Sequence, residues 1–169
     1  MRAHLVQLDM AWEQPETNFR RVEGLLSGAD MRPGDLVLLP EMFATGFSLR
    51  TELTADRGET LGFIRELAAR HACYVQGGRT VLPRHGDKAA NVMTAAGPDG
   101  QVLCEYAKIH PFSFGREPER FRGGDEVRTW DWEHGDARVR VCPAVCYDLR
   151  FPELFRIGAL RGAEVFALG

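Results

Sequence analysis

The sequence lacks long apolar runs and an excess of positive charge. No segment approaches the ~20 apolar residues that cross a bilayer, and the N-terminus has no apolar stretch followed by a small-residue cleavage site. We therefore predict a cytoplasmic protein with no membrane partner. The formal net charge of the 169 residues is -3 at pH 7, which provides no basic surface for nucleic acid.

Cysteine is sparse, and the residues Cys73, Cys104, Cys142 and Cys146 include no C-x-x-C pair. A disulfide framework is not expected in a chain of this length without a secretion signal. A zinc site is not expected either. The segment from Cys142 to Cys146 is typical of a strand, on which residues at this spacing share a face but lie too far apart to bind one ion. We predict no metal site.

The segments that are present alternate between strand-like and helix-like patterns. Amphipathic periodicity predicts helices over residues 15–29, 58–71 and 151–162, and the first should bury Phe19, Val22, Leu25 and Leu26. Apolar or alternating runs predict strands over 3–10, 35–40, 73–82, 127–135, 137–146 and 163–169, and a hairpin over 89–108. The alternation indicates one α/β domain with a mixed sheet, in which residues 109–126 form a long irregular loop.

Three polar or reactive residues, Glu41, Lys108 and Cys146, each follow a predicted strand. Open α/β sheets place their chemistry at such strand ends. A cysteine attacks as the thiolate, a carboxylate can take the thiol proton, and a lysine can stabilise an oxyanion, to which the backbone N–H of Tyr147 would add a donor. Taken singly, Cys146 is also compatible with a small buried hydrophobic residue, Glu41 with a solvated carboxylate and Lys108 with a solvated ammonium.

The segments "LPEMFATGFS", "EYAKIHPFSF" and "VCYDLRFPEL" resemble, in this order, the signature segments of the nitrilase superfamily, the carbon–nitrogen hydrolases. The resemblance covers the whole chain and is greatest to omega-amidases. It implies an αββα sandwich in which Cys146 is the nucleophile, Glu41 the general base and Lys108 the oxyanion-stabilising cation. The implied reaction is hydrolysis of a small carboxamide through a cysteine thioester, with release of ammonia and without metal or organic cofactor. A homodimer or higher homo-oligomer is expected.

The resemblance also implies a second glutamate in the loop before the cysteine. Counting back from Gly123 places it at Glu117, with Glu119 as a rival. Pro143 departs from the family pattern, because proline cannot donate to a sheet ladder; the strand must be bulged there or lack a partner at that position. Family members continue well past "EVFALG", so we expect residues 1–169 to be a C-terminally incomplete domain that self-associates and is inactive alone.

Alternative functions remain open. Within the superfamily, the chain could hydrolyse a nitrile or a carbamoyl substrate. Outside it, the chain could be a catalytically inactive fragment that acts by association, or a redox cysteine protein. For an acidic substrate such as an alpha-keto-acid amide, Arg79 and Arg150 are candidate carboxylate partners. His110 is a candidate acid–base group or a loop histidine bonded to a carbonyl. Asp148 with Arg150 and Glu153 with Arg156 are expected as local salt bridges.

Overall fold

The computed structural model describes residues 1–83, 86 and 88–169. The strands are β1 (Ala3–Leu5), β2 (Leu36–Leu38), β3 (Tyr74–Val81), β4 (Ala89–Ala96), β5 (Val102–Ala107), β6 (Phe121–Arg122), β7 (Trp130–His134), β8 (Ala137–Ala144) and β9 (Val165–Leu168). The helices are α1 (Pro15–Ser27), α2 (Thr51–Thr54), α3 (Glu59–His71), α4 (Glu117–Arg120) and α5 (Pro152–Leu160), with the 3-10 turns η1 (Ser113–Gly115) and η2 (Cys146–Arg150).

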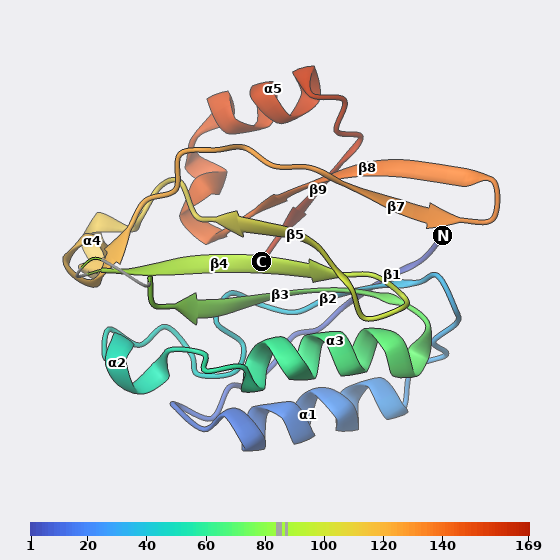
Figure 1. The fold of residues 1–169 in the computed structure, drawn as a ribbon, viewed down its shortest axis with the longest axis horizontal. Helices are drawn as coiled ribbons and strands as arrows, with labels where there is room; N and C mark the ends of the chain where they lie inside the picture. Colours follow the sequence, from blue (N-terminus) through green and yellow to red (C-terminus); the bar gives the residue numbers. More distant parts are fainter. Residues whose placement is uncertain (84–85, 87) are drawn as a thin grey trace.

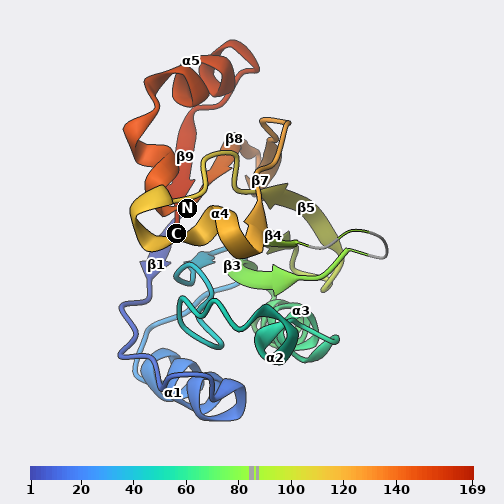
Figure 2. The ribbon, with the colours of Figure 1, turned by 90° about the vertical axis from the view of Figure 1, so that its left-hand side faces the viewer.

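These elements stack in four layers (Figure 1), and the order of the layers is the same when the molecule is turned (Figure 2). Helices α1 and α3 cover a six-stranded sheet of order β1-β2-β3-β4-β5, in which β6 pairs with β4. A three-stranded sheet of order β7-β8-β9 follows, and α5 covers its outer side. Both sheets contain parallel and antiparallel pairs, so the predicted αββα sandwich with mixed sheets is confirmed.

The alternation of side chains along the strands explains the layers. In β2, Val37 packs toward the helices and its neighbour Leu36 packs toward the smaller sheet. Trp130 and Trp132 lie in the core between the two sheets rather than at an interface. Among the described residues, no helix has both the length and the apolarity needed to cross a membrane.

The first helix corrects one detail of the predicted core. Val22 and Leu26, four residues apart, are buried, whereas Leu25 is 51% exposed. A step of one residue rotates a side chain by about 100° around a helix. Leu25 therefore points away from the face on which Val22 and Leu26 are buried. The first strand is also shorter than predicted, since β1 ends at Leu5.

Glycine and proline fit their places in the sheets for steric reasons. A side chain at Gly78 would lie 2.5 Å from the Met42 nitrogen and 2.8 Å from the Glu41 Cα, so β3 approaches the segment after β2 backbone to backbone.

Pro143 lies in a regular part of β8 that pairs with Ala167 of β9. The pairing of β8 with β7 has already ended at Val141, so the proline nitrogen faces a side without a strand partner.

Candidate active site

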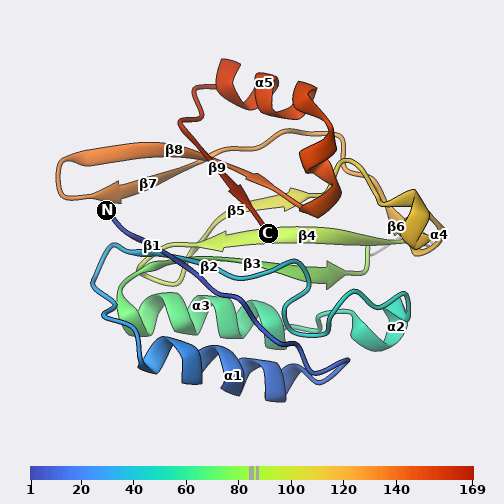
Figure 3. The same ribbon diagram turned by 180° about the vertical axis from the view of Figure 1, so that it is seen from behind.

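The two sheets bring the three predicted strand-end residues together. Glu41 follows β2 and Lys108 follows β5 in the larger sheet, while Cys146 begins η2 after β8 of the smaller sheet. All three line one cavity of about 610 Å³. Strand β9 crosses over the larger sheet (Figure 3), and the carbonyl of Gly169, directly after β9, accepts the Cys146 backbone N–H at 2.8 Å.

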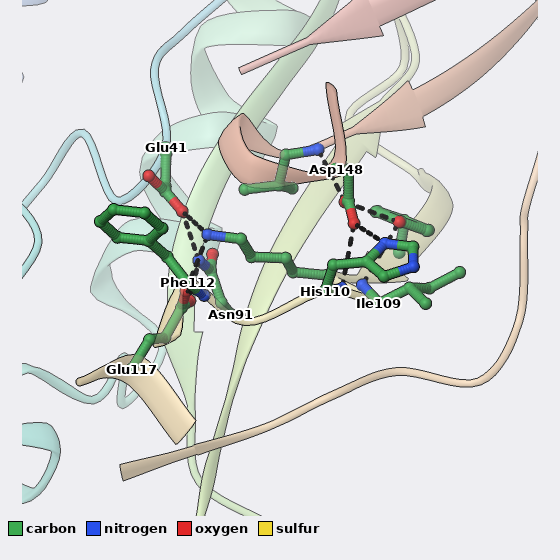
Figure 4. A network of polar contacts seen from close by, with 10 residues as sticks. Glu41, Asn91, Ile109, His110, Phe112, Glu117 and Asp148 are labelled. Carbon is green, nitrogen blue, oxygen red and sulfur yellow. Dashed lines mark hydrogen bonds and ion pairs between the residues drawn. The ribbon is translucent and has the colours of Figure 1, made fainter. Parts of the chain in front are cut away.

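Lys108 lies between the carboxylates of Glu41 and Glu117, both of which are labelled in Figure 4. Its Nζ is 2.8 Å from Glu41 Oε1 and 2.8 Å from Glu117 Oε2, and the Lys108 and Glu117 side chains are almost completely buried. Burial alone would lower the pKa of Lys108, but the two glutamates raise it above its ordinary value. Lys108 is therefore a firmly held ammonium at neutral pH.

The structure places the two rival glutamates in different surroundings. Glu117 begins α4, is fully buried and also accepts the Phe112 backbone N–H at 2.6 Å. Glu119 lies on the surface and pairs with Arg116. Only Glu117 therefore joins the polar cluster around Lys108.

Asn91 of β4 belongs to the same cluster and was missed in the sequence. Its Nδ2 donates to Glu41 Oε1 at 2.6 Å and to Glu117 Oε1 at 2.9 Å (Figure 4). A polar residue inside the apolar run "AANVMTAA" was the available signal, because a buried amide needs partners.

Cys146 differs from the other cysteines in exposure and in backbone conformation. It is the exposed one of the four free cysteines, and its φ of 43° lies in the left-handed region that non-glycine residues rarely adopt. Partial loss of solvent around the sulfur raises the pKa of the Cys146 thiol, the negative charge of Glu41 raises it further, and Lys108 opposes both. At neutral pH the group is therefore a thiol.

The other three cysteines, Cys73, Cys104 and Cys142, are buried, and burial raises the pKa of these thiols to about 11, 12 and 11. Within the described ranges no group of three or more His, Cys, Asp or Glu side chains is arranged to hold a metal ion.

The turn that starts at Cys146 is held by Asp148. This fully buried carboxylate accepts the Val145 N–H at 3.1 Å, the Tyr106 hydroxyl at 2.8 Å and the His110 N–H at 3.0 Å, and its Oδ1 lies 2.8 Å from His110 Nδ1 (Figure 4). The expected pair of Asp148 with Arg150 is therefore wrong, because the carboxylate points inward.

The His110 ring is bonded to a carboxylate rather than to a carbonyl, and it stacks on Phe151. The expected pair of Glu153 with Arg156 is absent from the described residues.

The exposed cavity wall is mainly apolar, but Glu13, Ser48 and Arg50 also line it. Arg50 pairs there with Glu13, which also accepts the Ser48 hydroxyl. Neither Arg79 nor Arg150 lines the cavity, and Arg79 is bonded to Asp56. The lining residues are Trp12, Glu13, Glu41, Phe47, Ser48, Leu49, Arg50, Lys108, Phe112, Gly115 and Cys146.

Comparison with known proteins adds an independent observation. The family model described as carbon-nitrogen hydrolase matches residues 2–168. The chain belongs to this family. The predicted membership of the nitrilase superfamily is therefore confirmed, and the relatives described next agree with its omega-amidase-like branch.

Among the relatives of this chain is an omega-amidase of Yersinia enterocolitica, 31% identical over 90% of this chain and 56% of the relative. A 2-oxoglutaramate amidase of Bacillus subtilis is 27% identical over 95% of this chain and 61% of the relative. The chain thus spans about three fifths of the length of these curated relatives.

A solved structure also superimposes on this chain. It is a CN-hydrolase superfamily protein from Xanthomonas campestris with an arsenic adduct in its active site. The TM-score is 0.80 at 36% identity, over 90% of this chain and 56% of that one. This likeness agrees with the sandwich described above.

Proposed function

We propose that the chain contains the catalytic residues of an amidase within one hydrolase domain that includes residues 1–169. Cys146 is the nucleophile, Glu41 the general base, and Lys108 with the Tyr147 N–H the oxyanion site. Glu117 holds Lys108 from the side opposite Glu41. The observation that supports this best is the meeting of an exposed cysteine of positive φ with Glu41 and Lys108 at one cavity.

The first half of the reaction forms a thioester. Glu41 takes the Cys146 thiol proton, and the sulfur bonds to the amide carbonyl carbon. The negative charge on the carbonyl oxygen is stabilised by Lys108 and by the Tyr147 N–H, for which the described residues provide no acceptor. Glu41 then passes the proton to the leaving nitrogen, the C–N bond breaks, and ammonia departs.

The second half releases the acid. Glu41 takes a proton from water, whose oxygen attacks the thioester carbonyl. The C–S bond breaks, the sulfur regains the proton from Glu41, and a carboxylic acid leaves. Because the thiol pKa is raised, this base is needed in each turnover at neutral pH.

We propose a small carboxamide with a carboxylate at its far end, such as an alpha-keto-acid amide, as the substrate. Two relatives with the names omega-amidase and 2-oxoglutaramate amidase support this class. The apolar wall and Arg50 at its polar side are compatible with a short carbon chain that ends in a negative charge.

The test is ammonia release from a panel of alpha-keto-acid amides, neutral amides, nitriles and carbamoyl compounds, with Cys146→Ala as the matched control. Release from the amides is expected from a chain extended with a family-type C-terminal segment, and none from the same chain carrying Cys146→Ala; residues 1–169 alone are expected to release none. Preference for nitriles or carbamoyl compounds would replace the proposed substrate class. No release from any compound, with Cys146 still open to alkylation, would favour an inactive chain that acts by association.

A further inference from the structure

Asn91 contacts both glutamates of the cluster, as Lys108 does. It lies in β4, is 1% exposed and does not line the cavity. Its two Nδ2 protons go to Glu41 Oε1 and Glu117 Oε1, at 2.6 and 2.9 Å. The same amide group thus donates a hydrogen bond to each carboxylate.

This orientation leaves the other end of the amide without a partner. The Asn91 Oδ1 is buried and has no hydrogen bond among the described residues. A buried acceptor without a partner is costly and rare in native proteins. Turning the amide over would not help, because Oδ1 would then face two carboxylate oxygens. The contacts with the glutamates therefore determine the orientation.

The main chain of Asn91 also holds the third member of the cluster. Its carbonyl accepts the Lys108 backbone N–H at 2.8 Å. One residue thus contacts the Lys108 backbone and both carboxylates that bind the Lys108 ammonium.

The consequence for Glu41 is specific to one oxygen. Oε1 accepts from both Asn91 Nδ2 and Lys108 Nζ, at 2.6 and 2.8 Å. Oε2 is free of these two donors and is the better acceptor for a thiol proton. A base needs one available oxygen in a fixed position.

We propose that Asn91 is a positioning residue, which holds Glu41 and Glu117 on either side of Lys108 and leaves Glu41 Oε2 for the Cys146 proton. This inference rests on the proposed function. The charged groups around the thiol are Glu41 after β2, Lys108 after β5 and Glu117 on α4, with the Glu13–Arg50 pair at the cavity wall.

Two variants test it, with a matched control on the same strand. Asn91→Leu removes both donors, and Asn91→Asp keeps the shape but adds a third carboxylate. Thr94→Val is the control, because Thr94 is equally buried in β4 and loses one hydrogen bond, from Arg79, away from the cluster. Circular dichroism and thermal melting establish that each variant is folded, and Asn91→Asp remains informative if Asn91→Leu is not.

We expect kcat for amide hydrolysis to fall by about 10²-fold in both Asn91 variants, with KM changed by less than about threefold. The pH profile of Cys146 alkylation by iodoacetamide should move to higher pH in Asn91→Asp, since added negative charge disfavours the thiolate. Thr94→Val should change neither readout. Native kcat and an unmoved alkylation profile in the Asn91 variants would overturn the proposal, as would an equal fall in Thr94→Val.

The alkylation profile separates this inference from the proposed function. If the chain extended with a family-type C-terminal segment hydrolyses no amide, the proposed function fails, but the profile still reports the charges around Cys146. A shift in Asn91→Asp alone then supports the positioning role, and no shift rejects it.

Discussion

Two polar networks flank the segment around Lys108, and both appear in Figure 4. The first joins Glu41, Asn91, Lys108 and Glu117, and it opens onto the cavity through Glu41 and Lys108. The second gathers donors on the fully buried Asp148 and reaches no cavity-lining residue.

The two networks also differ in charge. The first contains two carboxylates and one ammonium, with an oxygen of Glu41 left over for another partner. In the second, a single carboxylate is surrounded by donors, including the Val145 N–H directly before Cys146. A network with spare acceptor capacity can exchange a proton, whereas a saturated one stabilises geometry. The difference suggests that the first network serves the reaction and the second holds the turn of Cys146.

The largest effect should come from Cys146, which lies beside Glu41 and Lys108 at the cavity. Cys146→Ala removes the proposed nucleophile, so in a chain extended with a family-type C-terminal segment ammonia release from the preferred amide should become undetectable while the fold remains. The replacements Cys73→Ala, Cys104→Ala and Cys142→Ala should lower the melting temperature at most. Amide turnover by Cys146→Ala at the native rate would contradict the mechanism.

Breaking the first network at its base should give the next largest effect. Glu41→Gln keeps the size of the side chain but cannot accept a proton, so the acylation rate should fall by at least about 10²-fold in rapid-quench measurements. Glu119→Gln is the surface control and should acylate at the native rate. Normal acylation by Glu41→Gln would move the role of base to Glu117.

Breaking the second network should affect stability more than chemistry. Asp148→Asn replaces one carboxylate oxygen with an NH2 group, which cannot accept the hydrogen bonds of the surrounding donors. The free energy of unfolding should therefore fall by about 1–3 kcal/mol in urea titrations. Turnover should fall by about tenfold, since the Cys146 turn loses one support. The exposed Glu153→Gln on α5 is the control. A larger loss of turnover than in Glu41→Gln, with native stability, would show that Asp148 belongs to the reaction.

The smallest effect concerns the thiols themselves. Because its pKa is raised, the Cys146 thiol should react slowly with iodoacetamide at pH 7 and faster as pH rises through that pKa. Lys108 lowers the thiol pKa, so Lys108→Met should move this curve to higher pH. Mass spectrometry should find Cys73, Cys104 and Cys142 unlabelled in the folded chain; labelling of Cys142 at the same rate would contradict the difference in burial.

Much of the fold was predictable from periodicity, and the exceptions have local causes. The three predicted helices and the hairpin lie where predicted, because their apolar spacing is regular. The short helices α2 and α4 were not predicted, and α4 and β6 lie in the segment 109–126 that was predicted to be an irregular loop. The face of α1 could not be resolved between Leu25 and Leu26, since both are leucine and only packing against β2 and β3 distinguishes them. The pair Gly77–Gly78 predicted a bulge or a close approach, and the structure has the close approach.

The site was predictable only where residue type suggests chemistry. Glu41, Lys108 and Cys146 were found from their places at strand ends and from the motif resemblance. Asn91 was not found, because an amide in a strand indicates nothing about the strands beside it. Asp148 was assigned to a nearby arginine, since short-range spacing cannot reveal that its partners come from Tyr106 and His110. Contacts between distant segments decided both cases.

The positive φ of Cys146 destabilises the fold, whereas the proposed reaction requires the sulfur of this residue. A residue with a Cβ in this conformation costs roughly 1–2 kcal/mol, whereas glycine adopts it freely. Among variants that have lost the sulfur, Cys146→Gly should therefore unfold at a higher temperature than Cys146→Ala. Selection for thermal stability alone would discard this cysteine early, so its retention in a stabilised library would report selection for turnover.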